Sequence, residues 1–166
     1  MDAVTVGAAM DRDIDGVPPD MRISDLIQKM RATHRSGFVV VDDSMNLLGI
    51  VTAKDVENAI LEKPAESLTV GDICTRNVVV CRPDQTLSAA LSQFGVHSYG
   101  RIPVIDPLDP TKIIGIVKRQ DVITACVQAR MRSDAMVAQA EAYENLSRKA
   151  AMTLESATVH AGAVLA

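Results

Sequence analysis

Thr52 and Asp55 are the residues whose types and spacing best fit a chemical role in this sequence. They follow the apolar run Leu47–Val51, which predicts a strand, and a helical pattern begins within about three residues. Backbone N–H groups at a helix start, with a hydroxyl beside them, bind anions, and a carboxylate there can bind the two hydroxyls of a ribose. Thr52 can instead be the N-cap of the helix, with Asp55 as the acid of a capping box, which explains both residues without a ligand.

Other residues with chemical potential do not form a catalytic pattern. Asp42 and Asp43 lie where a turn must follow a strand, and local hydrogen bonding in the turn explains them. The sequence has no G-x-S-x-G nucleophile motif and no Gly-rich phosphate loop of the Walker type. Its three cysteines form no C-x-x-C pair, and its three histidines are far apart in the sequence. We therefore predict a protein that is not an enzyme, with no catalytic cofactor, no metal site and reduced thiols.

Composition limits the remaining classes. The 166 residues are 48% hydrophobic but only 2% aromatic, so the core must be aliphatic. A net charge of −4 offers no basic surface for nucleic acid. No run approaches the roughly 18 apolar residues of a membrane span, and the acidic amino end does not resemble a signal peptide. We expect a cytoplasmic protein that neither binds nucleic acid nor inserts into a membrane.

One pattern occurs twice in the chain. The two copies match at an offset of 64 residues, which becomes 66 after a turn that is longer in the second copy. Agreement at many points with one gap at a turn identifies an internal repeat. The matched positions are Thr5–Gly7 with Thr69–Gly71, Pro19-Asp20 with Pro83-Asp84, Asp42 with Asp106, Gly49 with Gly115, and Asp55 with Asp121.

Each copy predicts the order strand, helix, strand, strand, helix, which is an α+β fold. The first helix has Ser24 as its expected N-cap, and the second copy opens with an expected strand at Val78–Val80. A unit of about 60 residues buries too little surface alone, so the copies must pack on each other. After them, a long Ala-rich helix is predicted because no Gly or Pro occurs before Gly162. The expected domains are residues 1–66, 67–129 and 130–166.

These motifs resemble a tandem pair of cystathionine β-synthase (CBS) domains, also called a Bateman module. The marks are Thr69–Ile73, the Pro-Asp pairs, the G-x-x-P-V-x-D strand at Gly100–Asp106 and the G-I-V-x-x-x-D pattern at Gly115–Asp121. The likeness covers about residues 4–129. It implies two copies around a pseudo-twofold axis, with an adenine nucleotide or S-adenosylmethionine bound between them, and a regulatory role without catalysis.

The resemblance implies two clefts, each formed by both copies. In the first, Asp55 would bind the ribose, Thr52 and Arg101 the phosphate, and apolar residues the adenine. The second departs from the family pattern, because Lys118 stands where Ser or Thr is usual and Val39 where Pro is usual. The first set is Thr52, Asp55, Val80, Tyr99, Gly100, Arg101, Ile102 and Pro103, and the second is Val17, Arg35, Ser36, Gly37, Phe38, Lys118 and Asp121.

The resemblance also suggests partners. Tyr99–Pro110, Ile113–Gly115 and His34–Phe38 are similar to the cytoplasmic CBS pair of bacterial chloride channels and antiporters. We therefore expect AMP, ADP or ATP as regulatory ligand, a homodimer formed through the repeats, and a channel or transporter as the regulated partner. A stand-alone CBS protein that regulates an enzyme, and an assembly module that binds no ligand, are the alternatives.

Overall fold

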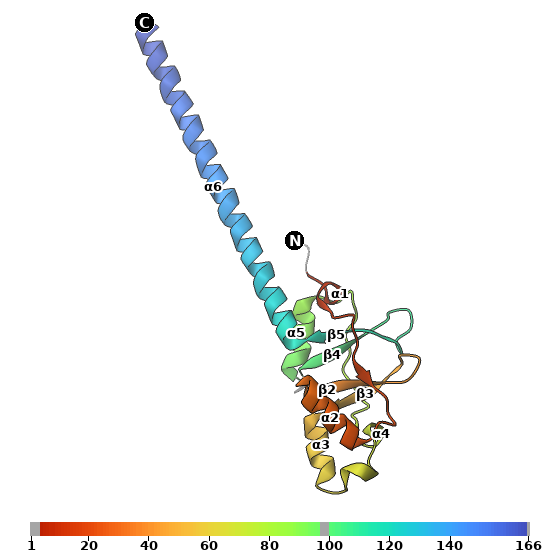
Figure 1. Ribbon diagram of the computed structural model, residues 1–166. Coiled ribbons are helices and arrows are strands. Elements are labelled where there is room, and N and C mark those ends of the chain that lie inside the picture. The colour runs from red at the N-terminus through yellow and green to blue at the C-terminus, as the bar shows by residue number, and fades with distance from the viewer. Residues whose placement is uncertain (1–3, 97–99, 166) are drawn as a thin grey trace. The chain divides into compact units, whose positions relative to one another are not determined.

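The structure is a computed structural model that describes the backbone of residues 4–96 and 100–165. The chain divides into two compact units, Met1–Cys126 and Val127–Ala166. The elements follow the order α1 (Val6–Ala9), β1 (Gly16–Val17), α2 (Ile23–Thr33), β2 (Gly37–Val41), β3 (Leu47–Thr52), α3 (Ala53–Ile60), the 3-10 helix η1 (Ala65–Ser67), α4 (Val70–Ile73), α5 (Leu87–Val96), β4 (Arg101–Ile105), β5 (Ile113–Lys118) and α6 (Arg119–Leu165) (Figure 1).

The first unit has the predicted α+β architecture, built from two small sheets. In one sheet β2 lies between β1, which is parallel to it, and β3, which is antiparallel. In the other, β4 pairs with β5 in the antiparallel register that β2 and β3 also use, including a bulge after Val40 and after Val104. The repeated sequence therefore gives a repeated hairpin, with an equivalent irregularity in both copies.

The predicted strand at Val78–Val80 is wrong. In the described chain these residues belong to no strand, and Cys81 instead forms a single parallel bridge with Val104. Cys81 stands 64 residues after Val17 of β1, so the pairing falls just beyond the predicted run. Val78 is apolar for a different reason, because it packs against a cluster formed by strands of both sheets.

The segment that precedes the sheet of each copy packs on the other copy. Asp11, from the first copy, exchanges backbone hydrogen bonds of 2.8 and 2.9 Å with Ile116 of β5. Thr75, its equivalent in the second copy, exchanges bonds of 2.9 and 2.8 Å with Ile50 of β3. The two lead-in segments, residues 5–11 and 69–75, are therefore exchanged between the copies around the expected pseudo-twofold relationship.

Three apolar clusters follow from this exchange. One joins Val6 of the first lead-in to Phe94 and Val117 of the second copy. Another joins Val70 of the second lead-in to Leu26 of the first copy. A third lies between the sheets and comprises Val39, Val41, Ile50, Ile113 and Ile116. Burial of these aliphatic side chains stabilises the two copies as one body, since their removal from water contributes roughly 1.5–3 kcal/mol per side chain.

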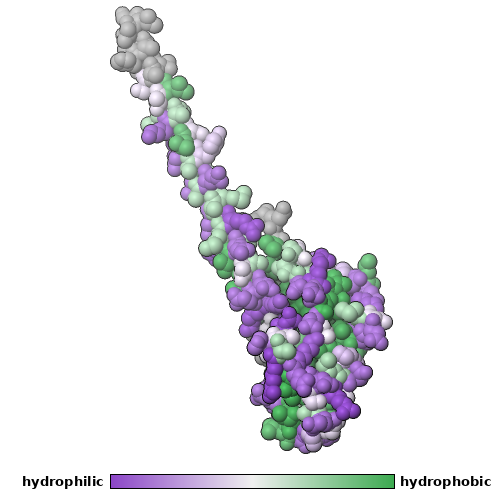
Figure 2. Space-filling model, in the orientation of Figure 1, coloured by the Kyte–Doolittle hydropathy of each residue, from purple (hydrophilic) through white to green (hydrophobic). Residues whose placement is uncertain are grey.

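The helix α6 has two different parts. Its first turns belong to the first unit, where Val122 is completely buried. From Val127 its large apolar side chains are exposed, including Met136 and Tyr143. On the face drawn in Figure 2, hydrophilic and hydrophobic residues are interspersed along this part. Within the described residues, no helix has the length and apolar character needed to cross a membrane.

Candidate functional site

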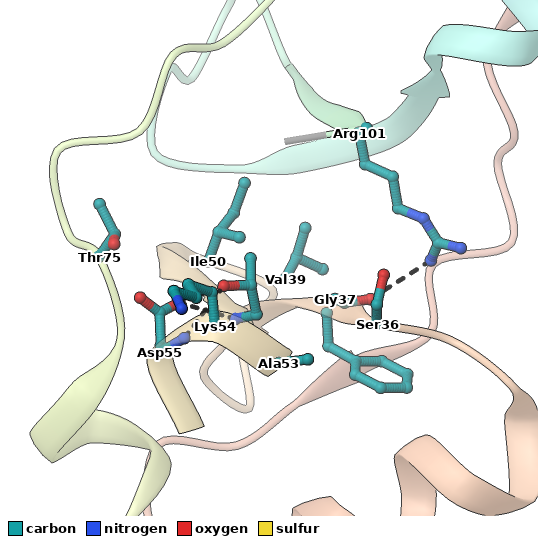
Figure 3. Close-up of a pocket in the computed structure, with 12 residues that line it drawn as sticks. Ser36, Gly37, Val39, Ile50, Ala53, Lys54, Asp55, Thr75 and Arg101 are labelled. Atoms are coloured by element: carbon teal, nitrogen blue, oxygen red, sulfur yellow. Dashed lines mark hydrogen bonds between the residues drawn. The ribbon is translucent and has the colours of Figure 1, made fainter. Parts of the chain in front are cut away.

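A cavity of about 520 Å³ lies in the first unit, where the start of α3 faces the first residues of β2 and β4 (Figure 3). Four residues expected in the first cleft line it: Thr52, Asp55, Gly100 and Arg101. Its apolar wall includes Val39 and Ile50 from the two sheets' shared cluster. A carboxylate, a hydroxyl and a guanidinium therefore border one hollow beside apolar surface.

Thr52 and Asp55 form a capping box at the start of α3. The carboxylate oxygen Oδ2 of Asp55 accepts hydrogen bonds from the backbone N and the Oγ1 hydroxyl of Thr52, both at 2.8 Å. In return the backbone N of Asp55 donates to Thr52 Oγ1 at 3.3 Å. The other carboxylate oxygen, Oδ1, makes no hydrogen bond within the described part of the chain. The helix cap thus holds the carboxylate in place while half of its acceptor capacity stays available.

The backbone at the start of α3 contributes less to an anion site than its sequence suggested. The N–H of Ala53 donates to the carbonyl oxygen of Ser36 at 2.8 Å, and that of Asp55 is used in the cap. With two of the first three N–H groups of α3 committed within the protein, side chains become the main source of positive charge. Arg101 and Lys54 both line the cavity, although Lys54 also lies 3.4 Å from the carboxylate of Glu57 on the exposed side of α3.

Arg101 is half-buried, and its Nη1 donates to the carbonyl oxygen of Gly37 at 3.4 Å. Desolvation lowers the pKa of Arg101 from its usual value, and nearby Arg35 lowers it further, while Asp15 and Asp121 act in the opposite direction. A guanidinium is protonated at neutral pH despite such shifts. The cavity is therefore bordered by a cation that has lost part of its hydration, which favours an incoming anion.

The rest of the first predicted set lies at or beneath the wall. Ile102 is fully buried in the core, and Pro103 is buried in β4, where its carbonyl oxygen accepts from Cys81. Val80 is half-buried outside the lining, and Tyr99 lies outside the described residues. Thus Thr52, Asp55, Gly100 and Arg101 are the members of that set, among its described residues, that line the cavity.

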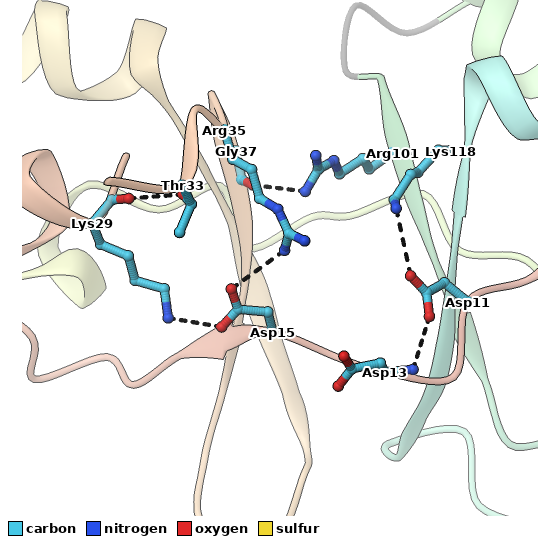
Figure 4. Close-up of polar contacts among 9 residues, drawn as sticks. All are labelled: Asp11, Asp13, Asp15, Lys29, Thr33, Arg35, Gly37, Arg101 and Lys118. Carbon is cyan, nitrogen blue, oxygen red and sulfur yellow. Dashed lines mark hydrogen bonds and ion pairs between the residues drawn. The ribbon is translucent and has the colours of Figure 1, made fainter. Parts of the chain in front are cut away.

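The second predicted set is divided. Ser36, Gly37 and Phe38 line the same cavity as the first set. Lys118 instead forms an ion pair with Asp11, the last residue of the first lead-in, and Arg35 forms one with Asp15 (Figure 4). Asp121 is exposed, and Val17 is completely buried in the core.

Several lining residues were not predicted, namely Val39, Ile50, Ala53, Lys54 and Thr75. Thr75 reaches the cavity because its segment pairs with Ile50, a contact between the copies that no local pattern encodes. Asp11 and Asp15 were also missed as partners of the expected cations. Their signal was present, since two carboxylates in a short segment complement two predicted cationic residues.

Among the described residues, no group of three His, Cys, Asp or Glu side chains is placed to hold a metal ion.

Comparison with known proteins assigns the fold to a family. The CBS domain model matches residues 6–62 and 70–128, so the chain belongs to the CBS domain family and carries two of its repeats.

Curated relatives contain this module within larger enzymes. The chain is 32% identical over 112 residues to inosine-5'-monophosphate dehydrogenase from Methanocaldococcus jannaschii, a match covering 68% of the chain and 21% of that enzyme. It is 29% identical over 119 residues to homoserine O-acetyltransferase from Methanosalsum zhilinae, covering 72% and 23%. The chain therefore spans less than a quarter of the length of these relatives, and the likeness is confined to the CBS part.

Solved structures of CBS pairs match this chain over nearly their whole length and over about three quarters of its own. The CBS-pair protein CBSX2 from Arabidopsis thaliana superposes with a TM-score of 0.69 and 26% identity, covering 78% of this chain and 99% of that chain. A structure of CBSX2 in complex with AMP gives a TM-score of 0.65 and 27% identity, covering 76% and 98%. These likenesses confirm the predicted CBS-pair fold.

Proposed function

We propose that this chain is a regulatory module that binds an adenine nucleotide in the cavity beside α3. The observation that carries the proposal is the convergence of Asp55, Thr52 and Arg101 on one hollow of about 520 Å³ with apolar walls. A carboxylate suits ribose hydroxyls, a guanidinium suits a phosphate, and an apolar wall suits a base. The AMP complex of CBSX2, at 27% identity, supports an adenine-containing ligand.

Each group has a distinct role in this proposal. The Oδ1 oxygen of Asp55 accepts from the ribose hydroxyls, while Oδ2 remains in the helix cap. Arg101 neutralises the phosphate, and Lys54 joins it by leaving Glu57, its ion-pair partner at 3.4 Å. The hydroxyl of Thr52 donates its proton to Asp55, so it meets a ligand only as an acceptor. Val39 and Ile50 provide apolar surface for the adenine. The arrangement of the carboxylate, the cations and the apolar wall around the cavity therefore fits AMP, ADP or ATP and does not select one of them.

The module regulates a partner or an attached domain and is not itself the catalyst. The two enzymes compared above match this chain only through their CBS parts, so their activities belong to their other domains. The resemblance to chloride channels and antiporters stays a prediction, because neither relative belongs to that group. A cytoplasmic location and a homodimer formed through the repeats also stay predictions from the resemblance.

The second candidate is an assembly module that binds no ligand. One observation favours it: the capping box accounts for Thr52 and Asp55 through contacts within the protein. In that case the cavity is a by-product of packing two copies. The two candidates differ in whether Asp55 acts on a ligand or only on the helix.

A thermal-shift experiment separates them, using AMP, ADP, ATP and S-adenosylmethionine with the wild type, Asp55→Ala and Asp72→Ala. Asp72 is the matched control, because its Oδ2 accepts from the backbone N of Thr69 at 2.9 Å in the capping box of α4, away from the cavity. Each substitution removes the acid of a capping box and leaves its N-cap threonine, so the effect on the helix start is of the same kind in both variants. A ligand at about 100 times its dissociation constant adds about 2.7 kcal/mol, enough to raise Tm by several degrees.

We expect the wild type and Asp72→Ala to respond to an adenine nucleotide, and Asp55→Ala to lose the response. If the wild type responds to none of the four compounds, the assembly module is the better account. If Asp55→Ala responds as strongly as Asp72→Ala, the ligand binds elsewhere.

A further inference from the structure

The two clefts of the CBS pair have equivalent residues, so they can be compared position by position. The offsets of 66 and 64 residues relate Thr52 to Lys118 and Thr75 to Asp11. The structure follows these offsets, because Thr75 bridges Ile50 and Asp11 bridges Ile116. The pair Lys118 and Asp11 therefore occupies in the second cleft the place that two threonines occupy in the first.

The contents of that place differ. In the first cleft Thr52 and Thr75 are short and uncharged, and both line the cavity of about 520 Å³. In the second cleft the Nζ of Lys118 lies 3.4 Å from Oδ2 of Asp11, with 33% and 40% of these side chains exposed (Figure 4). An ion pair thus stands where the first cleft has open space.

The carboxylate of Asp11 is fixed from both sides. Its Oδ1 accepts from the backbone N of Asp13 at 3.0 Å, which holds it in a tight turn, while Oδ2 contacts Lys118. The N–H of Asp13 and the charge of Lys118 keep the pKa of Asp11 below its usual value, although partial desolvation opposes them. The group is therefore an anion at neutral pH.

A second carboxylate in the same segment acts on another cation of this cleft. Asp15 contacts Lys29 Nζ at 2.7 Å through Oδ1 and Arg35 Nη1 at 3.3 Å through Oδ2. Its equivalent beside the first cleft, 64 residues later, is Val79, which carries no charge. The segment from Asp11 to Asp15 therefore neutralises Lys118 and Arg35, the two cationic residues of the second predicted set.

We propose that Asp11 and Lys118 are specificity-determining residues that restrict nucleotide binding to the first cleft, giving one ligand per chain. A phosphate entering the second cleft meets the carboxylate of Asp11, and it can reach Lys118 only by leaving that carboxylate half-buried and unpaired. The like charges of the phosphate and the carboxylate repel, and the contact between Lys118 and Asp11 is lost when a phosphate takes its place. This inference rests on the proposed function, since it concerns which of two related clefts takes the same ligand.

Isothermal titration with AMP tests the proposal through its stoichiometry. The wild type should bind one AMP per chain, and Asp11→Asn should bind two. The asparagine oxygen can still accept from the N–H of Asp13, so the turn is kept while Lys118 becomes available to a phosphate. Asp13→Asn is the matched control, because it removes the same charge from the same segment without touching Lys118; it should bind one.

The new site is then located by second substitutions in the Asp11→Asn background. Asp121→Ala should remove the added site and Asp55→Ala the original one, each leaving one AMP per chain. If Asp11→Asn does not fold, judged by its thermal transition, the double variant Asp11→Thr, Lys118→Thr recreates the threonine pair of the first cleft and should bind two.

Two AMP per wild-type chain overturn the proposal. So does a single AMP in Asp11→Asn, or, where that variant does not fold, in the double variant Asp11→Thr, Lys118→Thr. If the wild type does not bind AMP, the titrations are repeated with ADP and ATP, and failure to bind any of the three contradicts the proposed function instead. A single nucleotide gained in Asp11→Asn would then still support exclusion by the ion pair. No binding of AMP, ADP or ATP to any of these proteins overturns both.

Discussion

Arg101 and Gly37 occupy the same position in the two copies, 64 residues apart, and the Nη1 of Arg101 donates to the carbonyl oxygen of Gly37 at 3.4 Å. One copy therefore places a long cation where the other has no side chain. Arg101 lines the cavity of the first cleft and also lies within electrostatic reach of Arg35, Asp15 and Asp121 of the second. The Arg101 and Gly37 pair is therefore one position at which the two clefts differ in charge.

Arg101→Ala should weaken AMP binding far more than it weakens the fold. Hydrogen bonds to a charged group contribute about 1.5–3 kcal/mol, so we expect roughly a 10- to 100-fold loss of affinity in a titration. The free energy of unfolding, measured with urea, should change by less than about 1 kcal/mol, because removing a partly desolvated cation beside Arg35 offsets the lost contact. Arg82→Ala, at an exposed site, is the control. Unchanged affinity would remove Arg101 from the proposed site.

Gly49→Ala should destabilise the protein more than Gly115→Ala, although the two positions are equivalent. A Cβ on Gly49 would lie 2.6 Å from the carbonyl oxygen of Thr75, which is held in the bridge to Ile50. A Cβ on Gly115 would lie 2.6 Å from Sδ of Met10, at the flexible end of a side chain, and 3.1 Å from the carbonyl oxygen of Asp11. We expect a loss of about 2–3 kcal/mol for Gly49→Ala, and about 1 kcal/mol less for Gly115→Ala, in urea unfolding.

Gly100→Ala is the control for this comparison, since its Cβ would meet no atom of the described residues within 4 Å. Equal losses at Gly49 and Gly115 would show that the lead-in segments adjust equally well on both sides.

The secondary structure of each copy was predicted well, because the patterns that predict it involve residues close together in the sequence. Strand patterns, turns and the Thr52–Asp55 cap depend on neighbouring residues, and the offsets of 64 and 66 related them. The errors occur where the copies contact each other. Ser24 was expected to cap α2, but the helix begins at Ile23. The N–H of Ile23 donates to the carbonyl oxygen of Leu68 at 3.0 Å, and Leu68 directly precedes the second lead-in.

The candidate site shows the same division. Thr52 and Asp55 were found because a strand end and a helix start are adjacent in sequence. Thr75 was missed because it reaches the cavity through a bridge to Ile50, and Asp11 because its partner Lys118 is 107 residues away. Contacts of this kind depend on the packing of the copies, which no periodicity within either copy describes.

Asp42 should make the fold sensitive to acid. Its carboxylate accepts from the side chain and backbone of Asn46 and the backbone of Ser44, all at 2.9 Å, and these bonds lower its pKa below the usual 3.8. A lowered pKa in the folded state means that the stabilisation is present above about pH 4 and is lost as the pH falls through the folded value. Unfolding free energy measured from pH 6 to pH 2 should therefore fall less steeply for Asp42→Asn than for the wild type.

The slope should decrease without vanishing, because the pKa values of Asp11, Asp72 and Asp109 are also lowered. Asp43→Asn is the control, because this adjacent, exposed carboxylate takes no part in the hydrogen bonds to Ser44 and Asn46. A slope in Asp42→Asn equal to that of the wild type would show that its hydrogen bonds contribute equally in both protonation states.

Cys81 should resist thiol reagents in the folded protein. Burial raises its pKa to about 11, and its Sγ donates to Oε1 of Gln93 at 2.9 Å. The thiolate is the reactive form, so labelling at pH 8 should modify Cys74 and Cys126, which are half-buried, well before Cys81. Mass spectrometry of peptides identifies the labelled residues, and unfolding in urea should expose all three. Rapid labelling of Cys81 in the folded state would contradict its placement in the core.

The exchanged lead-in segments make the connection between the copies, around Lys63–Ser67, a poor place to divide the molecule. A cleavage there would give two fragments, and the core of each would be completed by the short helix and the β-bridge of the lead-in segment carried on the other. Such fragments behave as complementary halves that must associate before either is ordered. The two repeats thus form one cooperative folding unit, although their sequences are similar to each other. A substitution that destabilises one repeat should also destabilise the core of the other.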